Sequence, residues 1–251
     1  MTRRIFSGLL LVLATLFAPA GFAEAGKSAT VLITGANRGI GLELARQFNA
    51  KGYSVIGTAR KPSEADALAG LAVRVEQLDV TDAASVAALA ASLEGAPIDI
   101  LINNAGTGGQ GVSRIADADF EQMAWTFEVN SIGPMRITQA LLPNLAAGKG
   151  KTVVSVSSIM GSIENNQGGY YGYRASKAAL NQLNMSLSRE LGGQGFTCVV
   201  VHPGWVKTRM GGAQAPVEVQ DSVAGLVAVI EGLEPGDNGR FIDYQGNALP
   251  W

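Results

Sequence analysis

The sequence predicts an α/β fold: one doubly wound domain built on a seven-stranded parallel sheet. After about residue 28, short apolar and β-branched runs alternate with Ala-rich stretches of helical periodicity, which is the order of elements in parallel-sheet proteins. The apolar runs lack polar alternation, so both faces of each strand are expected to be buried. No linker, repeat or low-complexity run divides the chain, so the domain is expected to span residues 27–251.

The expected elements follow from these runs in chain order. Seven apolar runs are expected to be strands: Thr30–Thr34, Tyr53–Thr58, Val73–Leu78, Ile98–Ile102, Thr152–Val156, Thr197–Val201 and Gly239–Ile242. Four stretches have helical spacing of apolar residues: 39–52, 81–95, 120–145 and 173–191. Thr81 is the expected N-cap of the second helix, and Gly52 closes the first. Residues 210–220 are expected to form a small lid over an open site.

Composition excludes several classes of protein. Of the 251 residues, 47% are apolar and 16% charged, and the net charge of -2 describes an ordinary globular protein. Lys and Arg are scattered and slightly outnumbered by Asp and Glu, so no nucleic-acid partner is expected. The single cysteine, Cys198, excludes an internal disulfide framework. No Cys, His and Asp cluster has metal-ligand spacing, and no metal is expected.

The N-terminus has the pattern of a secretory signal peptide over residues 1–25. A basic "MTRR" precedes the apolar residues 5–18, and small residues allow cleavage after Ala23 or Ala25. "TRRIF" resembles a twin-arginine signal, although the general secretory route stays open. A periplasmic or secreted protein is expected, without a stable membrane anchor after processing because the apolar stretch is short. A misassigned start codon would instead leave the protein in the cytoplasm.

The stretch "TGANRGIG", residues 34–41, follows the apolar run "ATVLI" and contains three glycines. A glycine at a strand-to-helix junction permits positive φ, and another lets a ligand phosphate approach the backbone. The helix that follows would direct free N–H groups at a pyrophosphate. The spacing G-x-x-x-G-x-G differs from the G-x-G-x-x-G fingerprint, so close packing of helix on sheet is the alternative explanation.

Four further motifs follow in order: "NNAG" at 103–106, "SS" at 157–158, "YRASK" at 173–177 and "HPGWVKT" at 202–208. Together with the glycine stretch they resemble the short-chain dehydrogenase/reductase family, and more narrowly its C-factor-like and sniffer-like carbonyl reductases. The resemblance implies a Rossmann-type domain that transfers hydride between a nicotinamide cofactor and a small carbonyl or alcohol substrate. It leaves the oligomeric state open, a homo-oligomer included. The alternative is a nucleotide-binding signalling or sensing protein without significant turnover.

The resemblance assigns catalytic roles to Asn130, Ser158, Tyr173 and Lys177. Tyr173 is the expected general acid. Lys177 lies four residues later on one helix face, and a cation about 4 Å away would lower the tyrosine pKa by about 3 units. By the same resemblance Lys177 would hydrogen-bond the nicotinamide ribose, and Asn130 would hold a water in a proton relay. A structural bond from Asn130 to a local backbone carbonyl is the alternative.

Ser158 is expected to polarise the substrate carbonyl, with Ser155 and Ser157 as rivals for that role. The turn-forming loop "ENNQGG", residues 164–169, is expected at the mouth of the site. His202 is the single histidine, and a structural role is preferred to that of a general base. Arg209 either favours an anionic substrate or faces solvent, and solvent is preferred.

The cofactor is expected to be NADP(H) rather than NAD(H). An NAD enzyme would carry an acidic residue after the second strand, where this chain has Ala59 followed by Arg60, and Arg38 lies inside the glycine loop. Two guanidiniums without a carboxylate suit a 2'-phosphate. The alternative is that both arginines are solvated surface residues. Together with the family resemblance, these features imply the following cofactor-binding residues: Gly35, Asn37, Arg38, Gly39, Ile40, Gly41, Arg60, Asp79, Val80, Asn103, Asn104, Ala105, Gly106, Pro203, Gly204, Val206 and Thr208.

Overall fold

A computed structural model describes residues 29–251, and the predicted signal peptide lies outside these described residues. Seven strands form one sheet in the order β3-β2-β1-β4-β5-β6-β7, and every neighbouring pair is parallel. The strands are β1 (Thr30–Ile33), β2 (Ser54–Ala59), β3 (Arg74–Gln77), β4 (Ile100–Asn103), β5 (Thr152–Val156), β6 (Thr197–His202) and β7 (Phe241–Asp243). The predicted seven-stranded parallel sheet is confirmed, with small differences in strand ends.

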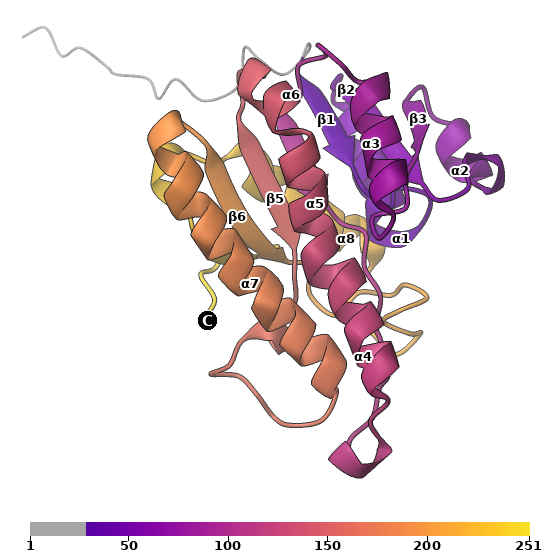
Figure 1. The fold of residues 1–251 in the computed structure, drawn as a ribbon, viewed down its shortest axis with the longest axis vertical. Helices are drawn as coiled ribbons and strands as arrows, with labels where there is room; N and C mark the ends of the chain where they lie inside the picture. Colours follow the sequence, from indigo (N-terminus) through magenta and orange to yellow (C-terminus); the bar gives the residue numbers. More distant parts are fainter. Residues whose placement is uncertain (1–28) are drawn as a thin grey trace, which may run out of the picture.

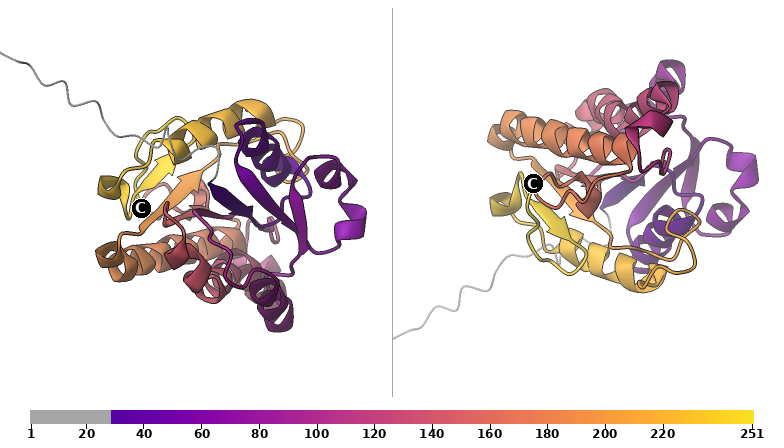
Figure 2. Two further views of the ribbon diagram at one scale, coloured as in Figure 1. Left: turned by 90° about the horizontal axis from the view of Figure 1, so that it is seen from above. Right: turned by 90° about the horizontal axis from the view of Figure 1, so that it is seen from below.

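Helices cover both faces of the sheet (Figures 1 and 2). They are α1 (Gly39–Ala50), α2 (Asp66–Ala69), α3 (Ala83–Ser92), α4 (Phe120–Phe127), α5 (Gly133–Ala140), α6 (Leu142–Ala147), α7 (Tyr171–Leu191) and α8 (Val219–Glu231). The sequence did not predict α2 or α8. In α8 a Cβ at Gly225 would lie 2.1 Å from the Tyr244 carbonyl oxygen, so close packing on the segment after β7 requires this helix-weakening glycine.

Two predicted helix boundaries were wrong. The N-cap of α3 is Asp82 rather than Thr81, because the Asp82 carboxylate accepts from the Ala84 N–H at 2.9 Å. The single helix predicted over 120–145 is divided into α4, a π-helical turn at Glu128–Ile132, α5 and α6. A π turn accommodates an extra residue within a helix, and such turns are frequent at functional sites.

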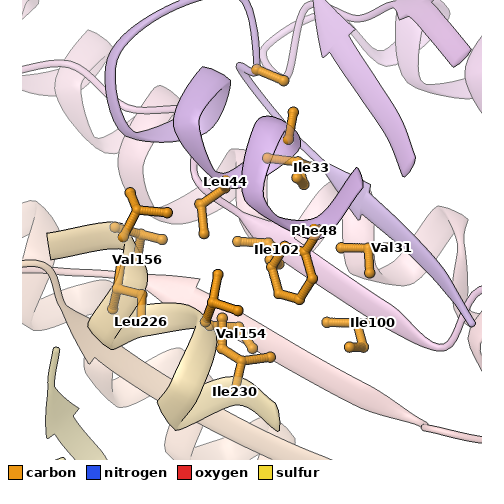
Figure 3. Packing of buried hydrophobic residues seen from close by; sticks show 14 of the residues in the cluster. Val31, Ile33, Leu44, Phe48, Ile100, Ile102, Val154, Val156, Leu226 and Ile230 are labelled. Atoms are coloured by element: carbon orange, nitrogen blue, oxygen red, sulfur yellow. The ribbon is translucent and has the colours of Figure 1, made fainter. Parts of the chain in front are cut away.

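The core forms on both faces of the sheet. On one face α1 and α8 pack on alternate strand residues, as Figure 3 shows for Val31, Ile33, Leu44, Phe48, Ile100, Ile102, Val154, Val156, Leu226 and Ile230. Leu32, between two of these residues, instead joins the cluster formed with α3, α5 and α6 on the other face. The expected burial of both strand faces is therefore confirmed for the inner strands but was wrong for β3, an edge strand whose Arg74 and Gln77 are exposed and whose Val75 and Glu76 are only partly buried.

The strand order reverses between β1 and β4, which are neighbours near the centre of the sheet. In doubly wound folds, ligands bind at the carboxyl ends of the strands beside this reversal. The ends of β1, β4, β5 and β6 with the loops that follow them, and the first turns of α7, carry the motifs singled out in the sequence, so the topology brings those motifs to one edge. Within residues 29–251, no helix combines the length and apolar character needed to cross a membrane.

Candidate active site

The glycine loop between β1 and α1 uses its three glycines in two ways. A Cβ at Gly35, where φ is +66°, would lie 3.0 Å from the Ala105 Cα, and one at Gly41 would lie 2.4 Å from the Gly35 carbonyl oxygen. These two glycines are therefore required by packing inside the protein. Gly39 differs, because its φ of +57° requires glycine while a Cβ would meet only Thr208 at an ordinary 3.6 Å. Close packing therefore explains part of the motif.

The first turn of α1 has free backbone donors. The helix begins after Arg38, whose backbone is extended and whose side chain makes no capping hydrogen bond, and its first turn contains no acidic residue. The first N–H groups of such a helix have no intrahelical partner and lie at the positive end of the helix dipole. Together with the adjoining Asn37 and Ile40, this loop fits the phosphate groups of a dinucleotide.

The "NNAG" segment after β4 holds the glycine loop in place. The Thr34 hydroxyl accepts from the Asn104 N–H at 3.0 Å, and the Asn104 amide donates to the carbonyls of Thr34 at 2.9 Å and Gly35 at 3.2 Å. Asn103 is buried and donates to the Thr138 hydroxyl at 3.1 Å, whereas its Oδ1 has no partner within the described residues. Asn104 thus has a structural task, and Asn103 is a buried residue bonded to the Thr138 hydroxyl.

Three arginines converge beside the glycine loop. Arg38, Arg60 and Arg209 are exposed, and none forms an ion pair within residues 29–251. Partial burial, the charge of Arg209 and the charge of Arg60 lower the pKa of Arg38. The sequence predicted that Arg38 and Arg60 lie beside the glycine loop, and it favoured a solvent-facing Arg209. Arg209 is exposed, and its nearness to Arg38 depends on the path of the loop after β6.

The residues expected near adenine follow β3. Burial raises the pKa of Asp79, but hydrogen bonds from Thr81 and the charge of Arg60 outweigh burial and lower the pKa overall. Val80 is buried, and its carbonyl accepts from Arg136 at 2.9 Å. The Asp79 carboxylate is therefore held locally, in its charged form, close to Arg60.

Tyr173 and Lys177 lie one turn apart near the start of α7. The Lys177 side chain is buried, its Nζ donates to the Val156 carbonyl at 2.8 Å, and burial lowers its pKa to about 8. Burial raises the pKa of Tyr173, and the nearby Ser158 hydroxyl lowers the pKa by less. The predicted lowering of the tyrosine pKa by Lys177 was wrong, because burial dominates and Nζ, 6.0 Å from the ring centre, is bonded to Val156.

The serines of β5 and the turn after it separate into structural residues and one free candidate. Ser157 donates to the Asn181 Oδ1 at 2.7 Å, and Ser155 donates to the Asn184 Oδ1 at 3.3 Å, both in the buried contact with α7. The Ser158 hydroxyl instead accepts from the Met160 N–H at 3.1 Å, and it lies near enough to the phenol of Tyr173 to lower the pKa of that group. The geometry therefore favours Ser158 over its two rivals for contact with a substrate.

Asn130 lies in the π turn and is fully buried. Its Oδ1 accepts from the Thr107 N–H at 2.8 Å, and its Nδ2 donates to the Thr107 carbonyl at 2.9 Å and the Ser176 hydroxyl at 3.0 Å. The structural alternative, a bond from Asn130 to a backbone carbonyl, is present. Its partner is not local in sequence, however, because Thr107 lies 23 residues away. Asn130 therefore holds the chain after β4 against α7. Nothing in the sequence around Thr107 had indicated that this residue is the partner of Asn130.

A glycine in the turn after β5 allows this close assembly, whereas Gly106 makes only ordinary contacts. A Cβ at Gly161 would lie 2.8 Å from the Lys177 carbonyl carbon, so only glycine lets the turn after β5 approach α7. A Cβ at Gly106 would lie 3.4 Å from the Asn130 Oδ1 and 3.8 Å from the Lys177 Nζ. The loop 164–169 leads into α7, and the Tyr170 N–H donates to the Val112 carbonyl at 2.7 Å, across the entrance to this region.

The segment after β6 reaches from the sheet to the glycine loop. Pro203 is buried, and its carbonyl accepts from the Ser222 hydroxyl at 2.6 Å. Gly204 has a φ of +84°, and Val206 is buried in a bridge with Val217. Thr208 is the member of this set that contacts the glycine loop, whereas the others support its path.

His202 ends β6, and its Nδ1 is buried without a partner in the described part of the chain. Burial lowers its pKa to about 4, and the charge of Asp243 opposes this shift only in part. The imidazole is therefore uncharged at neutral pH, in agreement with the preferred structural role. Among the described residues, no group of His, Cys, Asp or Glu is arranged to hold a metal ion.

Comparison with known proteins identifies the family. The model of the short chain dehydrogenase family matches residues 29–218. The C-signal protein of Myxococcus xanthus is 49% identical over 156 residues, which cover 62% of this chain and 93% of that protein.

Solved structures agree with this match. The NADPH-bound carbonyl reductase from chicken fatty liver has a TM-score of 0.83 and 35% identity, covering 90% of this chain and 100% of that one. The Sniffer carbonyl reductase of D. melanogaster has a TM-score of 0.85 and 35% identity, covering 89% of this chain and 100% of that one. The fold, the site and these relatives agree, and the chain belongs to the short-chain dehydrogenase/reductase family of oxidoreductases.

Proposed function

We propose that this protein is an NADP(H)-dependent oxidoreductase that transfers hydride between the nicotinamide and a small carbonyl or alcohol substrate, with Tyr173 as general acid and base. The observation that carries the proposal is the grouping of Tyr173 and Ser158 beside the buried Lys177 ammonium, whose Nζ lies 6.0 Å from the centre of the tyrosine ring. These groups lie at the sheet edge that also carries the glycine loop, so a cofactor and a substrate would meet there.

The residues around the glycine loop fit a phosphorylated dinucleotide. The uncapped first turn of α1 offers backbone N–H groups for the pyrophosphate, and Arg38 and Arg60 offer guanidiniums for a 2'-phosphate. Ala59 stands where an NAD enzyme would carry an acid for the ribose hydroxyls. The NADPH bound by the similar chicken enzyme supports the same choice of cofactor. When bound, NADPH supplies the hydride.

The chain's own residues manage the proton. A raised pKa keeps the Tyr173 phenol protonated at neutral pH, which suits a group that must donate a proton to a carbonyl oxygen. The Ser158 hydroxyl would donate a second hydrogen bond to the same oxygen, an interaction that strengthens as negative charge develops there. Carbonyl reduction is therefore the direction that the resting protonation state favours.

Lys177 supports the proton donor. Its ammonium lies beside the tyrosine ring and would stabilise the phenolate formed after proton donation. The lysine pKa of about 8 is close to neutrality, so this ammonium can return a proton to the phenolate and be protonated again. Asn130 and Gly106 keep the neighbouring backbone close to Nζ, which excludes bulk water from one side of the pair.

The test is NADPH oxidation by the protein against aldehydes, ketones and quinones, with Tyr173→Phe in parallel. The phenol is the proton donor, so the variant should lose at least about 1000-fold in kcat while its affinity for NADPH stays unchanged. Tyr171→Phe is the matched control, because Tyr171 lies on the same turn of α7 but is exposed. Unchanged turnover by Tyr173→Phe would refute the assignment.

A nucleotide-binding signalling protein is the second candidate, and the similarity to C-signal is the observation that favours it. The presence of the complete set of Asn130, Ser158, Tyr173 and Lys177 favours the enzyme. Tight NADPH binding by the parent without turnover of any carbonyl in the panel would support the signalling role instead.

A further inference from the structure

The loop after β6 is compact where it carries Arg209. The Gly212 N–H donates to the Thr208 carbonyl at 2.9 Å, and the Gly211 N–H donates to the Thr208 hydroxyl at 3.1 Å. The Trp205 indole N–H then bonds the Gly211 carbonyl at 2.8 Å. These bonds close residues 205–212 into a ring of backbone and side chain, so the position from which Arg209 projects is fixed.

This loop rests on both sides of the candidate site. On the glycine-loop side, the Thr208 methyl lies 3.6 Å from where a Gly39 Cβ would be. On the other side, the Met210 Cγ lies 3.5 Å from where a Gly108 Cβ would be, in the segment after β4. Arg209 stands between these two contacts, and Arg38 immediately precedes Gly39, so the two guanidiniums belong to neighbouring backbones.

The lysines next to Arg209 and Arg60 form ion pairs, whereas these arginines form none among the described residues. Lys207, on the same loop, forms an ion pair with Glu218, and Lys61, next to Arg60, forms one with Glu64. The three arginines of the cluster form no ion pair in the described part of the chain, although the Asp79 carboxylate lies near Arg60. Burial is the largest cause of the lowered pKa of Arg38, and repulsion by the charges of Arg209 and Arg60 lowers this pKa further. An anion of high charge density would relieve this repulsion.

We propose that Arg209 is a third arginine for the 2'-phosphate of NADP(H), carried by the loop 205–212 to the site formed by Arg38 and Arg60. The inference rests on the proposed function, since it assigns a further residue to the same cofactor site. Arg60 directly follows β2, where the adenosine ribose of a dinucleotide lies in doubly wound folds, so the arginines meet on the ribose side.

The assignment has a consequence for the substrate. The same loop carries Met210 over the segment after β4, so a bond from Arg209 to the cofactor would hold the substrate side of the loop in place. A 2'-phosphate carries nearly two negative charges at neutral pH and three acceptor oxygens, enough for three guanidiniums. NADH lacks this group and would leave the loop without that bond.

The experiment measures the affinity of the parent and of Arg209→Ala for NADPH and for NADH by direct titration, without substrate. Loss of a charge-assisted hydrogen bond should weaken NADPH binding about tenfold and leave NADH binding unchanged. Lys207→Ala is the matched control: it removes one positive charge from the same loop, but this charge is already paired with Glu218, so both affinities should change less than about twofold.

Other outcomes overturn the inference in distinguishable ways. Equal weakening for both cofactors would place Arg209 on the pyrophosphate, and no weakening would leave Arg209 in solvent. In either case a loss of NADPH preference in Arg38→Ala would leave the proposed function intact. A parent that binds NADPH no more tightly than NADH would refute the NADP(H) assignment itself, and this inference with it.

Discussion

Burial of Lys177 makes the stability of the protein depend on pH in a defined window. Burial lowers the lysine pKa from 10.5 to about 8, a difference of about 2.5 units. Each unit corresponds to about 1.36 kcal/mol, so keeping this ammonium buried costs the folded protein about 3 kcal/mol. The pKa is lower in the folded state, so the unfolded chain holds more protons between pH 8 and 10.5, and stability rises with pH across that window.

Lys177→Met removes the charge while keeping an unbranched side chain. The Val156 carbonyl loses its partner, which costs about 1 to 3 kcal/mol at every pH. Below pH 8 removal of the buried charge offsets that loss. The unfolding free energy of the variant minus that of the parent should therefore be about 3 kcal/mol higher below pH 8 than at pH 10.5.

The measurement is urea unfolding of the parent and the variant, without cofactor, at several pH values from neutral to 10.5. Comparing the two proteins cancels the contributions of Tyr53 and the buried Cys198, whose pKa values burial raises to about 12. Lys149→Met is the control, because it removes an exposed lysine. If the difference in unfolding free energy between parent and Lys177→Met stays constant with pH, Lys177 does not bear the burial cost deduced here.

Two further substitutions test the assembly of the site. In Gly161→Ala, the added methyl would lie 2.8 Å from the Lys177 carbonyl carbon. We expect urea unfolding to show a loss of about 2 kcal/mol in stability, and kcat to fall by a larger factor than KM changes. Full activity would show that α7 adjusts freely. Ser158→Ala should lower kcat about 100-fold in steady-state assays. Ser157→Ala should instead mainly lower the free energy of unfolding, by about 1 to 3 kcal/mol, because the Asn181 amide loses its partner. The reverse pattern would make Ser157 the substrate contact.

The sequence predicted the sheet well because its signal is local. Continuous β-branched runs are typical of strands buried on both faces, and all seven were found within a few residues of their predicted bounds. The helices were less certain for a physical reason. Gly225 weakens the helical signal of α8 yet is required by the contact with Tyr244, and the π turn at 128–132 depends on tertiary contacts of Asn130.

The site shows the same division. Motif order placed Ser158, Tyr173 and Lys177 on adjoining elements, since each lies at a strand end or on the first turns of a helix. The direction of the tyrosine pKa could not be predicted, because it depends on the depth of burial rather than on the spacing of two residues. The approach of Arg209 to Arg38 depends on how the loop after β6 turns, which no local pattern encodes.

The contact between β5 and α7 has a consequence for how accurately Tyr173, the proposed proton donor, is placed. Apolar side chains tolerate sliding, because one methyl group substitutes readily for another, whereas the amides of Asn181 and Asn184 meet single hydroxyls on the strand and the turn that follows it. A slip of α7 by one turn, about 5.4 Å, would leave these buried groups without partners. The polar contact thus sets the axial position of the helix, and hence of Tyr173, in a discrete way.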